Sequence, residues 1–149
     1  MKYLVKYLHR SPLERCLLLQ VVPLLLVVQL GLRLLPLQTL KRLLNQSAKA
    51  FPGGKQIGSS YPEQVVWAVT TARRRLFKDG SCLVQALVVE LFFRRKDYPA
   101  ELCIGITKEQ GGKLVAHAWV ESDGVIVIGG PESEVKRYSR LPALDGGLF

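Results

Sequence analysis

A long apolar run near the start of the chain restricts its fold more than any other feature. From Cys16 to Leu32 nearly every residue is apolar, with interruptions at Gln20, Pro23, Gln29 and Gly31. An exposed apolar surface of this size seldom stays in contact with water. The run must therefore be covered by the rest of the chain, by a partner protein or by lipid.

Three interpretations of this run compete. A transmembrane helix needs about 20 apolar residues, and this run is slightly short and contains two glutamines and a proline. A signal peptide would need a small-residue cleavage site, and none is evident. We favour a long helix or helical hairpin whose apolar faces pack against the rest of the chain or a partner. Membrane association stays open as the alternative, and the sequence does not separate insertion from surface binding.

The positive charge is concentrated in the same part of the chain. Residues 1–56 hold nine Lys and Arg against Glu14 alone, and so carry +8 of the net charge of +9. The remainder, with twelve basic and eleven acidic residues, is close to neutral. We therefore expect the positive charge to act through the N-terminal segment, and we expect no nucleic-acid partner.

Composition divides the chain into three parts. Residues 1–50 form a leucine-rich, basic, helical segment, and residues 51–60, which include Phe51-Pro52-Gly53-Gly54, form a linker. Residues 61–149 form the domain that carries the candidate chemistry. A chain of 149 residues with an apolar fraction of 48% is long enough to bury a substantial core.

Cys82 opens a predicted helix. Asp79-Gly80-Ser81 is a turn and capping signal, and the stretch from Cys82 to Phe93 follows it without a helix breaker. In the first turn of a helix, unpaired N–H groups and the positive dipole end favour the thiolate, which is the nucleophile. The same N–H groups are suited to hold a developing oxyanion. Cys82 is therefore the candidate nucleophile, whereas Cys103, in the middle of a predicted strand, is interpreted as a packing residue.

His117 lies in a predicted β-hairpin. Residues 113–121 read as a strand, Asp123-Gly124 as the turn, and Val125–Ile128 as the returning strand. A strand holds a general base in position more rigidly than a loop does. A cysteine at a helix start and a histidine on a later strand is the order of papain-like and transglutaminase-like enzymes. The sequence thus predicts an α+β fold, in which the helix of Cys82 packs on a small antiparallel sheet that carries His117.

The residues around these two positions resemble one family in particular. The chain contains, in order, Cys82-Leu83-x-x-Ala86-Leu87, Leu102-Cys103-Ile104-Gly105-Ile106, Ala116-His117-Ala118-Trp119-Val120-Glu121 and Ile128-Gly129-Gly130. In combination these motifs resemble the transglutaminase-like cysteine peptidase of lasso-peptide biosynthesis, the B-type protein that removes the leader from the precursor. The resemblance covers about Val65 to Leu141. With a leucine-rich segment in place of a leader-binding domain, the chain resembles the stand-alone protease half of the split form.

The resemblance implies a third catalytic residue, because this family has an aspartate near the end of the strand after the hairpin. The corresponding place here holds Ile128-Gly129-Gly130-Pro131, so that aspartate is missing. With a regular two-residue turn, His117 and Glu132 are diagonal neighbours on one face. Asp123 and Glu121 lie about 20 and 13 Å from His117 along one strand, too far to reach it. Glu132 is therefore the candidate carboxylate, with a backbone carbonyl or a side chain outside the hairpin as alternatives.

The resemblance implies a cysteine peptidase that needs no cofactor or metal. Cys82 would attack the scissile carbonyl, and His117 would take its proton and return it to the leaving amine. The implied partners are a precursor peptide cut between leader and core, a separate leader-binding protein and an ATP-dependent macrolactam synthetase. Three cysteines without a CxxC pair favour a reducing cytoplasm, with membrane association through the N-terminal segment as an addition. The missing aspartate keeps a second hypothesis, a non-catalytic adaptor that docks precursor and synthetase, and a third is a membrane-associated scaffold.

Overall fold

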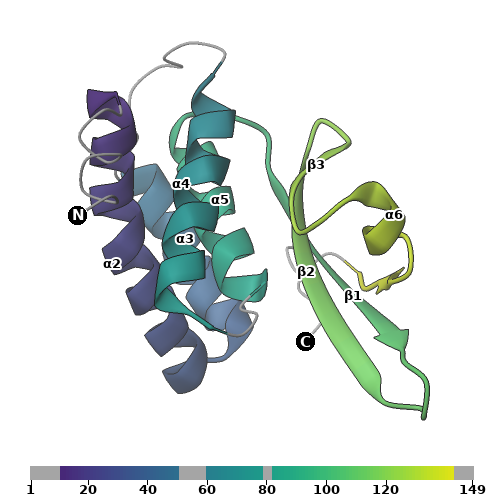
Figure 1. The fold of residues 1–149 in the computed structure, drawn as a ribbon. Helices are drawn as coiled ribbons and strands as arrows, with labels where there is room; N and C mark the ends of the chain where they lie inside the picture. The colour runs from purple at the N-terminus through teal and green to yellow at the C-terminus, as the bar shows by residue number, and fades with distance from the viewer. Residues whose placement is uncertain (1–10, 51–59, 79–81, 143–149) are drawn as a thin grey trace.

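The computed structural model describes residues 11–50, 60–78 and 82–142, which form a layer of helices packed on an antiparallel sheet (Figure 1). The predicted α+β class is confirmed. Within the described residues the sheet has the strand order β3-β2-β1-β4. The elements, in chain order, are α2 (Pro12–Leu34), α3 (Leu37–Ala50), α4 (Tyr61–Leu76), α5 (Cys82–Arg95), β1 (Glu101–Lys108), β2 (Leu114–Ser122), β3 (Val125–Ile128), α6 (Glu132–Val135) and β4 (Ser139–Arg140).

Helix α2 begins where the sequence places a capping signal. The Ser11 side chain accepts a hydrogen bond from the Glu14 backbone N–H, and the Glu14 carboxylate accepts one from the Ser11 N–H. This reciprocal pair satisfies two of the N–H groups that a helix start leaves without partners. Pro12 occupies the first turn, where its missing N–H costs nothing.

One face of the apolar run is buried against the other helices. Leu17, Val21, Leu25 and Val28 are each at most 3% exposed, and α2 packs against both α4 and α5. Their spacing of three and four residues places these side chains on one side of the helix. The interpretation of the run as a helix that packs on the rest of the chain is therefore confirmed for this face. The opposite face of α2 is exposed.

The leucine-rich segment and the predicted domain share a single core. Buried side chains of α2 and α3 join those of α4, α5 and the sheet in one continuous apolar cluster. The boundary drawn at residue 61 therefore does not follow the packing. Of the predicted linker, Ser60 occupies the N-cap position of α4 without a side-chain capping hydrogen bond, and residues 51–59 lie outside the described part of the chain.

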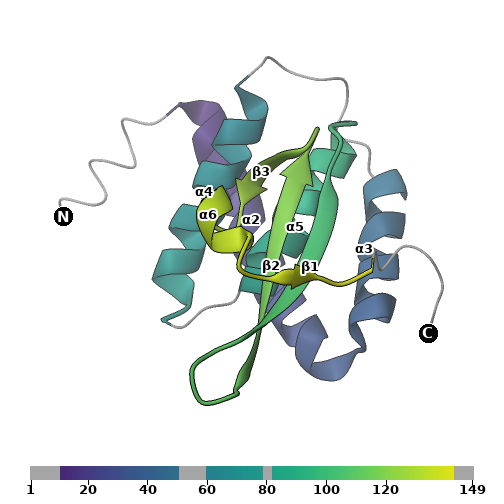
Figure 2. The same ribbon diagram turned by 90° about the vertical axis from the view of Figure 1, so that its right-hand side faces the viewer.

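The two faces of the sheet are covered by different elements. Helices α2 to α5 lie on one side of β1 and β2, and the short helix α6 lies on the other (Figures 1 and 2). On the first side, Ala118 and Val120 of β2 join the large core. On the second side, Cys103 and Trp119 pack with Val135 of α6 in a smaller apolar cluster. This division decides which side chains of β2 can meet those of α5.

The predicted hairpin forms, but its register differs from the regular one. Asp123 and Gly124 make the turn with φ values of 51° and 77°, as expected for a tight hairpin turn. A β-bulge between Val120 and Glu121 then shifts the pairing of β2 with β3. A bulge inserts one extra residue into one strand, so every contact beyond it moves relative to a regular ladder.

Candidate functional site

Cys82 is the first residue of α5, in agreement with the helix start predicted from the sequence. Its side chain is half-buried and packs against the large core between helices and sheet. The predicted cap at Ser81 lies outside the described residues. At the first position of a helix, Cys82 is close to N–H groups that have no partner within the helix. This is a suitable place for a thiolate or an oxyanion.

His117 lies on β2, as predicted, and is held from three directions. Its ring centroid is 6.2 Å from that of Trp119 and 5.0 Å from that of Tyr138. Its Nε2 is 2.5 Å from the carbonyl oxygen of Gly129. Because a carbonyl oxygen only accepts, Nε2 must carry the proton and donate. In the neutral imidazole this leaves Nδ1 as the nitrogen that can act as a base.

The described structure does not bring Cys82 and His117 together. Successive side chains of a strand point to opposite faces of the sheet. Ala118 faces the core shared with α5, so its neighbour His117 faces the other side, where its ring contacts Trp119 and Tyr138. Cys82 packs on the helix side. The two residues are on strand and helix as predicted, but the sheet lies between their side chains.

Glu132 does not orient His117 in this structure. It is the first residue of α6, its side chain is 71% exposed, and its carboxylate binds Lys136 Nζ at 2.8 Å. The hydrogen bond from Lys136, with the ammonium charge, lowers the pKa of the Glu132 carboxyl. The diagonal contact deduced for a regular hairpin fails for two reasons. The bulge shifts the register, and β3 ends at Ile128, before the chain enters α6 at Pro131.

Gly129, instead of Glu132, provides the hydrogen-bond acceptor for the His117 imidazole. It lies in the stretch where the resembled family has its aspartate, and it contributes a backbone carbonyl instead of a carboxylate. A backbone carbonyl was one of the alternatives to Glu132 left open by the sequence. The sequence feature that indicates this contact is the Gly129-Gly130 pair directly after a strand, since two glycines there are typical of backbone in an unusual conformation.

No side chain fits at Gly129 on this backbone. Its φ is +117°, and an added Cβ would lie 2.4 Å from Trp119 Cβ and 2.8 Å from Trp119 Cα. Both distances are below any ordinary carbon–carbon contact. The close approach that lets the Gly129 carbonyl reach His117 therefore excludes an aspartate at the same position.

A group of potential metal ligands lies at the start of β1, but its geometry is that of an ion-pair cluster. Glu101, Cys103 and Glu121 offer ligand atoms within 4.8 Å of one another. However, Arg140 donates to Glu101 at 2.6 Å and to Glu121 at 3.4 Å, so both carboxylates already pair with one cation, which offsets one of their two negative charges. Burial raises the pKa of the Cys103 thiol to about 11, so it stays protonated at neutral pH. Cys103 is a buried packing residue, as interpreted from the sequence.

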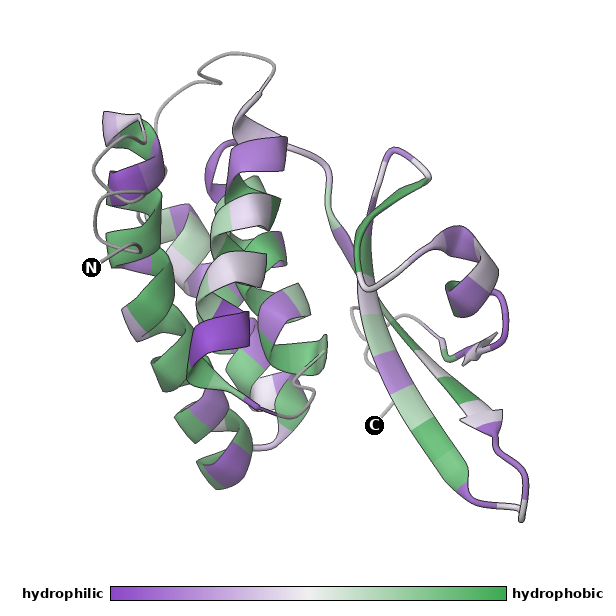
Figure 3. Ribbon diagram, viewed as in Figure 1, coloured by the Kyte–Doolittle hydropathy of each residue, from purple (hydrophilic) through white to green (hydrophobic). Residues whose placement is uncertain are grey.

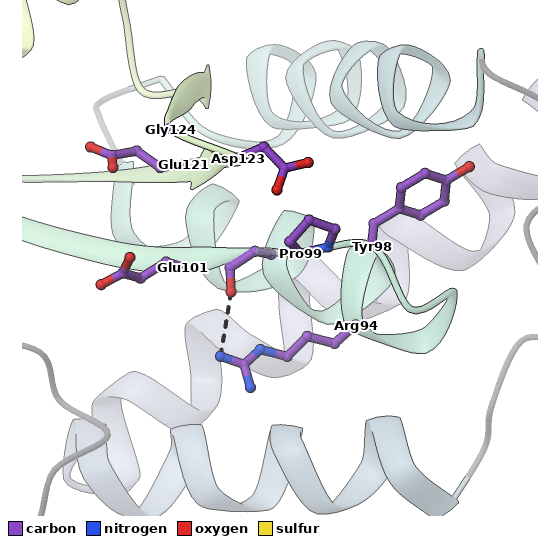
Figure 4. Close-up of a pocket in the computed structure, with 8 residues that line it drawn as sticks. Arg94, Tyr98, Pro99, Glu101, Glu121, Asp123 and Gly124 are labelled. Atoms are coloured by element: carbon purple, nitrogen blue, oxygen red, sulfur yellow. Dashed lines mark hydrogen bonds between the residues drawn. The ribbon is translucent and has the colours of Figure 1, made fainter.

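An open cavity of about 570 Å³ lies near the far end of α5 (Figure 4). Arg94, which donates to the Ala100 carbonyl at 3.5 Å, is one of the lining residues, and Glu101, Glu121 and Asp123 also line the cavity. Arg94 is twelve residues after Cys82 on the same helix, a separation of about 18 Å. The cavity is therefore separate from the start of α5.

Comparison with known proteins identifies the family. Residues 24–143 match the model of the transglutaminase-like superfamily, which is most of the chain and includes both Cys82 and His117. The chain belongs to the transglutaminase-like superfamily. The family match starts inside α2 and includes all of α3, in agreement with the single core of this transglutaminase-like domain. No curated protein and no solved structure matches the chain.

The fold expected from the resemblance is thus confirmed at the level of the superfamily. This superfamily includes cysteine peptidases. The more specific role in lasso-peptide maturation stays a prediction.

Proposed function

We propose that this transglutaminase-like protein is a cysteine peptidase that removes the leader from a ribosomally made lasso-peptide precursor. The observation that supports the proposal most is the family match, which includes a cysteine at a helix start and a histidine on a later strand. The motif resemblance around the two residues supports the narrower substrate class. Three free cysteines fit a reducing cytoplasm as its location.

The proposed reaction uses the two residues in the usual order of cysteine peptidases. The Cys82 thiol loses its proton to His117 Nδ1, and its sulfur adds to the scissile carbonyl. N–H groups at the start of α5 hold the oxyanion, and the imidazolium protonates the leaving amine. Water then hydrolyses the thioester, which releases the acid and restores the thiol. In the described arrangement the Gly129 carbonyl accepts a hydrogen bond from the ring, and we propose that it keeps this orienting contact during the reaction, in the role that an aspartate has in the resembled family.

This chemistry requires another arrangement of the hairpin than the one described, because the sheet separates the two side chains. His117 lies beyond the end of the β2–β3 ladder, which begins at Val120. Its ring is thus held by the Gly129 carbonyl and two aromatic contacts rather than by strand pairing on both sides. We propose that precursor or partner binding moves this part of β2 so that the imidazole reaches Cys82. The partners would be the leader-binding protein and the macrolactam synthetase of the resembled system.

A second candidate is a non-catalytic adaptor that docks precursor peptide and synthetase. Two observations favour it. The side chains of Cys82 and His117 lie on opposite sides of the sheet. Gly129 lies in the stretch where the resembled lasso-peptide proteases have an aspartate. In this case the fold is retained for binding while the catalytic arrangement is lost.

Cleavage of a precursor peptide separates the two candidates. The full-length protein is incubated with a lasso-type precursor, with and without the leader-binding protein, and the masses of the products are measured by mass spectrometry. The peptidase proposal expects cleavage at the leader–core junction by the native protein and by Cys16→Ala, but none by Cys82→Ala. Binding of the precursor without cleavage under both conditions would establish the adaptor and overturn the peptidase.

A further inference from the structure

The outer face of α2 carries an apolar stripe that nothing in the fold covers. Within the described residues it consists of five side chains, with 49 to 71% of each exposed: Leu19, Leu26, Val27, Leu30 and Leu34. At 100° per residue these positions gather on one side of the helix. That side is opposite the buried Leu17, Val21, Leu25 and Val28. The outer stripe, as we call these five residues, is about 22 Å long.

The buried face of the same helix excludes a membrane-spanning role for the folded protein. Helix α2 has 23 residues and is apolar enough to cross a bilayer by length and composition alone. However, Val21, Leu25 and Val28 are 0% exposed and form the core together with α4 and α5. Crossing a bilayer would expose the partner side chains on those helices to water. The folded domain can therefore place only the outer stripe in lipid.

The charge around the outer stripe fits an anionic surface. From Arg15 to Ala50 the chain contains no Asp or Glu, while Arg33, Arg42 and Lys49 are exposed. On the helix, the half-buried Arg15 and the exposed Arg33 lie along one edge of the stripe, and from there the Arg33 side chain can reach lipid phosphates while leucines enter the acyl region. A second copy of this chain would instead bring like charges together. Charge thus favours an anionic bilayer as the occupant.

The position of α2 leaves the rest of the molecule accessible. It lies at the edge of the helical layer that is remote from the sheet, and most of its length is apolar (Figures 1 and 3). Contact through this helix therefore leaves the face of the sheet that α6 covers directed away from the membrane (Figure 1), and the His117 ring contacts Tyr138 on that face.

We propose that this protein is a peripheral membrane protein that lays the outer stripe of α2 flat on an anionic bilayer. The fold stays intact, and the helix enters the headgroup region without crossing it. The proposal does not depend on peptidase activity.

Vesicle binding by the full-length protein tests the proposal. Sedimentation is compared for phosphatidylcholine vesicles with and without phosphatidylglycerol. The test variant carries Leu26→Gln and Leu30→Gln, and the matched control carries Leu114→Gln and Val125→Gln, which remove two apolar side chains that are each 64% exposed on the hairpin. Circular dichroism verifies that both variants are folded, and glutamine is a good helix former at both α2 positions.

The proposal expects binding to anionic vesicles that weakens with salt. The α2 variant should lose about tenfold in affinity or more, and the control variant should bind like the native protein. An alkaline wash should release the bound protein, as for a peripheral protein. The proposal is overturned by absent vesicle binding, by equal losses in both variants, by resistance to the alkaline wash, or by an α2-dependent dimer that forms without lipid.

Discussion

At Gly129 a backbone carbonyl, rather than a side chain, accepts the hydrogen bond from the His117 imidazole. With φ at +117° and Trp119 Cβ only 2.4 Å from a potential Cβ, Gly129→Ala should lower the free energy of unfolding by about 3 kcal/mol or more. Gly112, at φ +81° with open space around it, is the matched control. Gly112→Ala should cost only about 1–2 kcal/mol for the left-handed conformation. Urea unfolding checks both values, and equal costs would contradict the close contact with Trp119.

Because of Cys103, the free energy of unfolding should fall as the pH rises into the alkaline range. Burial raises the pKa of its thiol from the ordinary 9.0 to about 11. The unfolded chain therefore loses this proton at lower pH than the folded one. The contribution of Cys103 is fully present below pH 9 and is lost as the pH rises from 9 to 11.

The variant Cys103→Ala separates the effect of Cys103 ionisation on stability from that of other titrating groups. Tyr61, whose pKa burial raises to about 12, titrates in both proteins and cancels in the comparison. The difference in unfolding free energy between native protein and variant should shrink from pH 9 to 11. A constant difference would show that Cys103 ionises equally in both states.

The sequence predicted which elements carry the candidate residues, because local patterns decide that, but it did not predict contacts that depend on strand register. Cys82 at a helix start follows from a turn signal and a following stretch without a breaker, and His117 on a strand follows from alternation and an Asp-Gly turn. The prediction that Glu132 contacts His117 assumes a regular hairpin. A one-residue bulge after Val120 has no sequence signal of comparable strength, and it removed that contact.

At the scale of elements, a buried ion pair ties α3 to α5. Glu90, only 3% exposed, accepts from Arg94 at 2.8 Å and lies 3.9 Å from Lys41 Nζ, which is also buried. Glu90→Ala leaves the Lys41 charge buried without this carboxylate, so the free energy of unfolding should fall by about 3 kcal/mol.

An exposed pair of the same type is the control for this prediction. Glu132 and Lys136 also form a 2.8 Å contact four residues apart, but both side chains are more than 70% exposed. Glu132→Ala should leave the urea midpoint nearly unchanged, because water screens such pairs. Similar midpoints for the two variants would mean that burial does not strengthen the pair at Glu90.

At the scale of the whole molecule, the described helices of the leucine-rich segment, α2 and α3, share one core with α4, α5 and the sheet. Leu17, Val21, Leu25, Val28 and Leu40 contribute to the same core as α4 and α5. A truncated chain of residues 59–149 should therefore show no cooperative unfolding transition and should aggregate. Circular dichroism and gel filtration check this expectation. A soluble, cooperatively unfolding truncated chain would contradict the shared core.

The fold class could be predicted from the sequence because helix and strand periodicities are local. The shared core of the helices on the two sides of residues 51–60 could not be predicted, because a Pro-Gly-Gly stretch indicates a turn without indicating whether the elements on either side pack together. Likewise, the motifs place Cys82 and His117 on a helix and a strand. They do not determine which face of β2 meets α5, since that depends on the pairing of the whole sheet.

Covalent capture of the nucleophile tests the peptidase proposal most directly. The full-length protein, with the leader-binding protein present, is treated with a precursor-derived peptide that ends in a chloromethyl ketone at the leader–core junction. Digestion and mass spectrometry then locate the adduct. We expect a single adduct on Cys82, absent in Cys82→Ala and formed far more slowly in His117→Ala. An adduct on Cys16 or Cys103, or labelling of Cys82 at the same rate without His117, would contradict it.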